Sequence, residues 1–298
     1  MALDQSAQEW PLARATPVLI GGVARSGTRM LADILNVCPT VAIQPETPPK
    51  AIELFLKFAG DIDGIYAGLG QQLGRAVDQN WRQNRAGLLH ALFIAASRDR
   101  PSGVDRPVTH FGLKLPSLER YFSEFDRYYD APKPYMIYCM RRPDAVWRSI
   151  RSFGWQTDFE KFLQSYRRSM SHALAALARS PDRLVVFNLN AFLEGDSVEY
   201  VAGLCARLGV PLEAEAQARI AQVDNRNGIA ARGREYADTP ELAGQMQALL
   251  DNDVIRERWL TLTGVELPSP AAAPAIARRR KIGTKARSGT KSGASALG

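Results

Sequence analysis

The segment GVARSGTR, residues 22–29, brings small residues, hydroxyl groups and two positive charges into one short turn. The residues there that could do chemistry are Gly22, Arg25, Ser26, Gly27, Thr28 and Arg29. An apolar run precedes the turn and an amphipathic segment follows it, so we expect a strand, a tight loop and the start of a helix. Backbone N–H groups and positive charge at a helix N-terminus bind phosphate-like anions. The pattern therefore predicts a site for such a group.

The spacing of Gly22 and Gly27 is that of an ATP- or GTP-binding phosphate loop, but the neighbouring residues differ. In such a loop a Lys follows the last Gly and reaches the β- and γ-phosphates, and the next Ser or Thr holds Mg²⁺. Here Thr28 and Arg29 follow Gly27, and a basic residue lies earlier, at Arg25. The later apolar runs end in Arg or Asn rather than in an Asp that could hold a metal. We therefore expect no metal site and no metal-dependent NTPase.

The turn resembles the 5′-phosphosulfate loop of sulfotransferases that use PAPS (3′-phosphoadenosine 5′-phosphosulfate). Many members of that family read R-S-G-T-T-L at this place. By this resemblance, Arg25 contacts the bridging and sulfuryl oxygens of PAPS. The residues implied to cradle the 5′-phosphate are Ser26, Gly27, Thr28 and Arg29. Arg29 stands where Thr is common in the family, which adds charge to the loop.

A second motif lies more than 100 residues further along the chain, in RRPDAVWRS, residues 141–149. The same family binds the 3′-phosphate of PAPS with an Arg at the end of a later strand and a Ser eight residues on. Arg141 and Ser149 have that spacing, and Pro143 stands at the family's position. A guanidinium group offers a planar fork that suits phosphate. The resemblance thus implies a 3′-phosphate site at Arg141 and Ser149.

The resemblance also implies two catalytic groups besides Arg25. The segment ILNVCPTVAIQPETPPK, residues 34–50, resembles tyrosylprotein sulfotransferases and related bacterial proteins, and Glu46 falls on their catalytic Glu. Lys114, at the end of the apolar run HFGLKL, corresponds to the family's transition-state Lys. The Lys-Thr-His motif of hormone and phenol sulfotransferases is not matched, because Pro116 stands where its His would be. His110 is the alternative base, although we favour a packing or capping role for it.

Together these matches imply a single-domain, PAPS-dependent sulfotransferase that sulfates a hydroxyl group and releases PAP (3′,5′-ADP). The acceptor would be a carbohydrate, a lipid, or a tyrosine or other phenol. Two other classes stay open. A kinase-like phosphotransferase would need the missing Lys and Mg²⁺ ligands, and a non-catalytic nucleotide-binding protein would not need Glu46 and Lys114.

The acceptor and adenine sites are less readable from the sequence, as is the oligomeric state. A loop over the nucleotide is suggested by Arg226, Asn227 and Arg232. Four aromatic residues could line an acceptor site, although core packing is the better expectation for each: Tyr128, Tyr129, Trp147 and Trp155.

Alternating strands and helices must position these groups. Four apolar runs predict strands at residues 17–22, 110–115, 135–140 and 183–189. Helical patterns follow them, including one that we expect to begin with Ser117 as its cap. This alternation predicts a P-loop-like, three-layer α/β/α domain with a parallel sheet and helices on both faces. Ligands of such sheets bind at the carboxyl ends of the strands.

Charge divides the chain into a neutral body and a basic tail. The formal net charge is +7, but seven of the 38 basic residues and no acidic residue lie beyond Leu267, which leaves 31 basic against 31 acidic residues. We therefore expect no nucleic-acid partner. We predict an N-terminal segment (1–16), a sulfotransferase domain (17–266) and a disordered basic tail (267–298). Contact of the tail with an anionic membrane or polymer is the alternative to a purely solvated role.

Localisation signals are absent from the sequence. Residues 1–16 lack the apolar stretch of a signal peptide, and no run of about 18 apolar residues predicts a membrane-spanning helix. The three cysteines are widely spaced and suggest no disulfide framework. We therefore expect a cytoplasmic protein.

Overall fold

The computed structural model describes residues 14–96, 108–221 and 239–268. The chain divides into two units, Met1–Leu267 and Pro268–Gly298, and every described helix and strand lies in the first. The suggested nucleotide loop with Arg226, Asn227 and Arg232 lies outside the described residues, as does the chain after Pro268. No helix within the described ranges is long and apolar enough to span a membrane.

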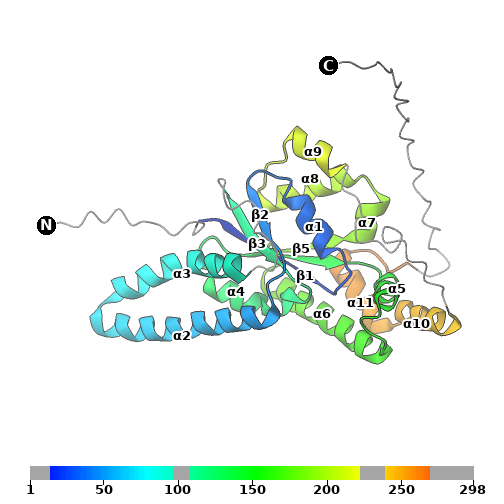
Figure 1. Cartoon of the computed structure of the whole chain (residues 1–298), viewed down its shortest axis with the longest axis horizontal. Helices are drawn as coiled ribbons and strands as arrows, with labels where there is room; N and C mark the ends of the chain where they lie inside the picture. Colours follow the sequence, from blue (N-terminus) through cyan, green and yellow to red (C-terminus); the bar gives the residue numbers. More distant parts are fainter. Residues whose placement is uncertain (1–13, 97–107, 222–238, 269–298) are drawn as a thin grey trace, which may run out of the picture. The chain divides into compact units, whose positions relative to one another are not determined.

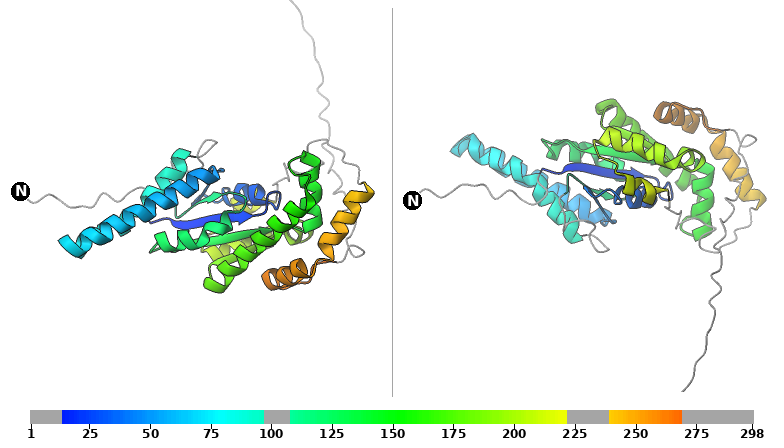
Figure 2. Two further views of the ribbon diagram at one scale, coloured as in Figure 1. Left: turned by 90° about the horizontal axis from the view of Figure 1, so that it is seen from below. Right: turned by 90° about the horizontal axis from the view of Figure 1, so that it is seen from above.

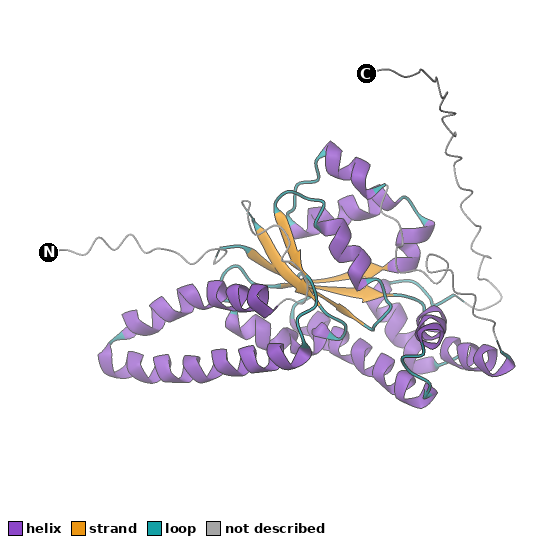
Figure 3. Cartoon of the chain, viewed as in Figure 1, coloured by secondary structure: helices purple, strands orange, loops and turns teal. Residues whose placement is uncertain are grey.

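Five parallel strands form one sheet in the order β2-β3-β1-β4-β5 (Figure 3). The strands are β1 Thr16–Gly22, β2 Val41–Gln44, β3 His110–Lys114, β4 Tyr135–Met140 and β5 Leu184–Asn188. The four predicted strands are confirmed, whereas β2 was not predicted, because it has only four residues and follows a turn closely. Since all strands run the same way, their carboxyl ends meet at one edge of the sheet.

Helices connect the strands and follow the last one. Those described are α1 Thr28–Leu35, α2 Pro49–Leu73, α3 Arg75–Ala96, the 3₁₀ turn η1 Leu118–Tyr121, α4 Phe122–Tyr128, α5 Pro143–Phe153, α6 Phe159–Arg179, α7 Leu189–Glu194, α8 Ser197–Leu208, α9 Ala214–Ile220, α10 Pro240–Leu250 and α11 Asp253–Thr263.

The helices lie on both faces of the sheet (Figures 1 and 2). Alternate strand residues such as Val18 and Ile20 pack against α1, α7, α8 and α9, whereas Leu19 and Leu113 face the opposite layer. That opposite layer contains α2 to α6, α10 and α11. Each face of the sheet is thus covered by apolar side chains, and the predicted three-layer α/β/α fold with a parallel sheet is confirmed.

The strands β1 and β4 are neighbours whose following helices lie on opposite faces of the sheet. The chain leaves β1 into α1 on one face and leaves β4 into α5 on the other. Such a topological switch point is where open α/β sheets bind ligands, just beyond the carboxyl ends of the strands. The two loops singled out in the sequence, 22–29 and 141–149, begin at this point.

The prediction that Ser117 caps an amphipathic helix is wrong. Ser117 has a left-handed backbone (φ 63°) and makes no capping bond, and η1 separates it from α4. The Ser117 N–H instead donates to the carbonyl oxygen of Gly22 at 2.8 Å. The segment therefore follows the end of β1 rather than the geometry of a helix start.

Candidate anion-binding and catalytic site

The loop between β1 and α1 has an unusual backbone. Gly27 has φ 104°, and Arg25, which is not a glycine, has φ 75°. A non-glycine residue in this left-handed region is uncommon and is often found at functional sites. We expected the N–H groups from Ser26 to Arg29 to face the concavity, but the Ser26 N–H donates to Val23 O at 3.1 Å within the loop. The N–H groups of the first turn of α1 remain without intrahelical acceptors.

The interior of the loop holds a buried polar group, a side-chain hydroxyl. The hydroxyl group of Ser26 is buried and has no hydrogen-bond partner among the described residues. Thr28 is also buried, at the start of α1. A side chain at Gly22 would lie 2.3 Å from Cys139 O, so only glycine fits the close approach of β1 and β4 there. The loop is therefore closely packed, and it encloses the Ser26 hydroxyl, which no described residue pairs.

The structure brings the two anion motifs together. The Arg25 Nε donates to the Ser149 hydroxyl at 2.9 Å, and the Arg141 Nη1 donates to Arg25 O at 3.3 Å. Ser149 is buried, in the second turn of α5. Residues that are 116 and 124 positions apart in sequence thus form one cluster at the ends of β1 and β4.

The cluster brings two guanidinium groups, those of Arg25 and Arg141, close together. Burial and the neighbouring Arg25 lower the pKa of Arg141 to about 10, and Asp144 offsets this only in part. Two guanidinium groups held close together favour a bound anion, which would relieve their repulsion and share their donors. The arrangement suits a phosphate-like ligand.

Three further residues hold this cluster in place, and none of them belongs to the sequence motifs described above. The Tyr166 hydroxyl donates to Arg141 O at 2.8 Å, and the Arg142 N–H donates to the Asn190 side chain at 2.9 Å. The Phe153 ring lies 4.3 Å from the guanidinium carbon of Arg25. Asn190 lies in the first turn of α7, two residues after the end of β5, so a search of the residues that follow strands could have found it. Nothing in the sequence points to Tyr166, which lies within α6.

Lys114 and Glu46 form an ion pair between Lys114 Nζ and Glu46 Oε1. Lys114 ends β3, and its side chain is only 5% exposed, whereas Glu46, just beyond β2, is 36% exposed. The pair lies at the same edge of the sheet as the anion loop, because β3 is the neighbour of β1. A buried cation and a solvent-accessible carboxylate are thereby placed together.

The alternative base, His110, lies at the opposite edge of the sheet. It begins β3, four residues before Lys114, so it is roughly 13 Å from Lys114 along the strand. Its Nε2 contacts Leu208 O at 2.8 Å, and burial lowers its pKa. The favoured packing role for His110 agrees with this position.

Two other expectations differ from the structure. The Arg29 side chain is exposed and pairs with Asp33 at 3.5 Å, so its guanidinium lies along the surface of α1 rather than inside the loop. The expectation that Trp155 packs in the core is wrong, because this residue is 62% exposed. The centroid of its ring lies 5.5 Å from the guanidinium carbon of Arg25. The other three aromatic residues are buried as expected: Tyr128, Tyr129 and Trp147.

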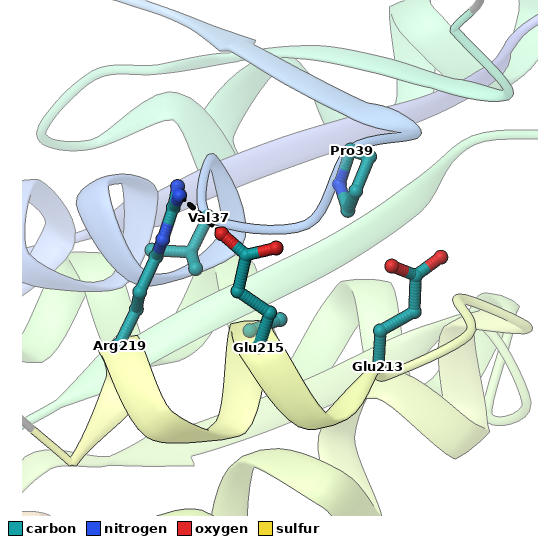
Figure 4. A pocket seen from close by; sticks show the side chains of 6 residues that line it. Val37, Pro39, Glu213, Glu215 and Arg219 are labelled. Atoms are coloured by element: carbon teal, nitrogen blue, oxygen red, sulfur yellow. Dashed lines mark hydrogen bonds and ion pairs between the residues drawn. The ribbon is translucent and has the colours of Figure 1, made fainter.

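A pocket of about 150 Å³ lies away from this site (Figure 4). It is lined by Val37 and Pro39, after α1, and by residues at the start of α9, where Glu215 pairs with Arg219. Val37 and Pro39 lie just before β2 begins, so the pocket is near the amino edge of the sheet. Within the described part of the chain, no group of three or more His, Cys, Asp or Glu residues could hold a metal ion.

Comparison with known proteins gives one family match and several structural ones. The model described as "Sulfotransferase family" matches residues 17–214. Sulfotransferase STF9 from Mycobacterium avium shares 14% identity, with a TM-score of 0.49 over 87% of this chain and 80% of that one. The sulfotransferase domain of the Synechococcus PCC 7002 olefin synthase shares 18% identity, with a TM-score of 0.49 over 90% and 100%. Mouse sulfotransferase SULT7A1 complexed with PAP shares 13%, with a TM-score of 0.41 over 87% and 95%. No curated protein matches.

Proposed function

This chain belongs to the sulfotransferase family, and we propose that PAPS is its sulfuryl donor and a hydroxyl group its acceptor. The observation that carries the proposal is the convergence of Arg25, Arg141 and Ser149 at the ends of β1 and β4. A donor with a 5′-phosphosulfate and a 3′-phosphate needs two neighbouring anion sites. The two motifs supply one each.

The residues present fit such a donor. The buried hydroxyl group of Ser26, which has no partner within the described part of the chain, can donate to a phosphate oxygen. Thr28 and the N–H groups at the start of α1, including that of Arg29, would hold the 5′-phosphate together with Gly27. Arg141 and Ser149 would hold the 3′-phosphate. When bound, PAPS supplies an activated sulfuryl group and a phosphate leaving group.

The catalytic roles implied by the resemblance are compatible with the ion pair between Glu46 and Lys114. Glu46 takes the proton from the acceptor hydroxyl as the new oxygen–sulfur bond forms and the bond between sulfur and the leaving phosphate oxygen breaks. Lys114 and Arg25 stabilise the negative charge that develops on that leaving oxygen. Lys114 is buried, so its charge acts where water screens it little.

The proposal is tested by turnover. The full chain is given PAPS and a panel of hydroxyl acceptors: a phenol, a tyrosine peptide, a sugar and a lipid alcohol. PAP release that depends on both PAPS and one acceptor is expected. A second assay replaces PAPS with ATP and Mg²⁺. ADP release in that assay, without any turnover of PAPS, would favour the kinase-like alternative instead.

A further inference from the structure

A buried carboxyl group lies directly behind the anion loop. Glu119, in η1, is 2% exposed, and its Oε2 accepts a hydrogen bond from the Gly22 N–H at 2.8 Å. Its Oε1 lies 2.5 Å from the Ser169 hydroxyl of α6, which in turn lies 3.0 Å from the Tyr138 hydroxyl of β4. One side chain thus links the start of the anion loop to two other elements of the fold.

Gly22 is held on both sides by the segment after β3. Its carbonyl oxygen accepts from the Ser117 N–H, and its N–H donates to Glu119. A side chain at the preceding Gly21 would lie 2.5 Å from Glu119 Oε2 and 2.9 Å from Glu119 N, so the two segments are in close contact. Gly22 is the last residue of β1, and Arg25 follows three positions later. The place where the loop starts is therefore set by Glu119 and Ser117.

The surroundings of Glu119 disfavour its charged form. Burial raises its pKa, and the hydrogen bonds from Ser169 and Gly22 and the charge of Arg120 oppose this only in part. Tyr138 of β4, on the same face of the sheet, and Cys139, on the other face, also have pKa values raised well above their usual range by burial. Both carboxyl oxygens of Glu119 accept a hydrogen bond, Oε2 from the Gly22 N–H and Oε1 from the Ser169 hydroxyl, so the side chain is held in one orientation.

We propose that Glu119 is a positioning residue that sets the start of the anion loop through Gly22 and thereby tunes the affinity for the donor. The inference rests on the proposed function, because the ligand that it tunes is PAPS. Burial favours the neutral form of Glu119 over its carboxylate. Ionisation places a negative charge behind the loop that binds the phosphosulfate and so weakens donor binding.

Calorimetry with PAP as the probe tests this on the full chain. Glu119→Gln keeps the shape of the side chain and an oxygen that can accept from the Gly22 N–H, so at the acid end of the pH range it binds PAP as tightly as the wild type. Glu119→Ala leaves the Gly22 N–H without an acceptor and binds PAP at least about tenfold more weakly. Gly21→Ala, which pushes Glu119 away, weakens binding in the same direction. Glu124→Gln, an exposed carboxylate of α4, is the matched control and changes nothing.

The pH dependence separates positioning from a purely structural role. As the pH rises, the affinity of the wild type falls relative to that of Glu119→Gln, because only the wild type can lose the proton. The ratio of the two affinities removes the effect of ionisation of PAP itself. The melting temperature changes with pH in the same direction. Because burial raises the pKa of Glu119 in the folded state, its stabilising contribution is present at low pH. This advantage over Glu119→Gln is lost as the pH rises through the folded-state pKa of Glu119.

Three outcomes of the PAP-binding experiments would overturn the inference. A wild type that binds PAP, with Glu119→Ala binding it equally well, overturns the inference and leaves the proposed function intact. A Glu119→Gln variant that binds PAP much more weakly than the wild type at every pH also overturns it, because the hydrogen bond to Gly22, which Gln can keep, would then not be what positions the loop. A wild type that does not bind PAP overturns the proposed function and this inference together.

Discussion

At the scale of single residues, the account depends most on the pair Glu46 and Lys114. The carboxylate is accessible and the ammonium is buried, which suits a base that meets the acceptor and a cation that faces the leaving group. We predict that Glu46→Gln lowers kcat on the order of 10²–10⁴-fold, because it keeps the size of the side chain but removes its basicity. PAP affinity, measured by calorimetry, should remain nearly unchanged.

His110→Ala is the control for this choice of base. Its imidazole is engaged with Leu208 at the far edge of the sheet, so its loss should cost some stability and little turnover per folded molecule. If His110→Ala is inactive while Glu46→Gln keeps nearly full activity, the base has been chosen wrongly.

Lys114→Ala tests the other half of the pair. We predict a lower kcat together with weaker binding of PAPS, since Lys114 acts on the leaving group rather than on the acceptor. Steady-state kinetics with varied PAPS separate the two effects. A variant with unchanged kcat would remove Lys114 from the transition state.

The residues that we propose to contact ligands were easier to predict from sequence than those that support them. Arg25, Arg141 and Ser149 lie in short motifs with fixed spacing, and the structure brings them together. Tyr166 and Glu119 act on backbone groups more than 20 positions away, and no local pattern marks such contacts. A single inward-facing Glu in a short 3₁₀ turn has the same sequence signature as a helix cap.

At the scale of elements, the turn from β1 to α1 requires glycine at position 27. Its φ of 104° is unfavourable for other residues, and an added Cβ would lie 3.1 Å from Leu189. We predict that Gly27→Ala destabilises the fold by about 1–2 kcal/mol and weakens PAP binding further, because the loop must move to relieve the strain. Chemical denaturation and calorimetry measure the two effects.

Gly64→Ala is the matched control for this substitution. Gly64 lies within α2 with no atom within 4 Å of an added Cβ, so alanine there should stabilise the helix by up to about 1 kcal/mol. Equal effects of the two substitutions on PAP affinity would show that the conformation of the loop does not matter.

At the scale of the whole molecule, the succession of strands and helices along the chain followed from the sequence, because continuous apolar runs are reliable signals of buried strands. The strand β2 was missed because Val41–Gln44 is short, although it places Glu46 at the edge of the sheet. The strand order could not be predicted, since it depends on contacts between distant elements. It is this order that puts β1 beside β4 and joins the two anion motifs.

The basic tail tests the domain boundaries. Leu267 is buried, so the cut is placed after Pro268. We predict that removal of residues 269–298 leaves the melting temperature and PAP affinity unchanged, because this segment is poor in large apolar residues. A large drop in melting temperature would mean that the segment packs against the rest of the chain.

The central claim is that this fold holds a donor with two phosphate groups, and its most direct test compares PAP with 5′-AMP in calorimetry. We predict that PAP binds about 10–100-fold more tightly, since charge-assisted contacts to the 3′-phosphate contribute about 1.5–3 kcal/mol. Arg141→Ala should remove most of this preference while 5′-AMP binding changes little. Equal affinities of the wild-type protein for PAP and 5′-AMP would contradict the account.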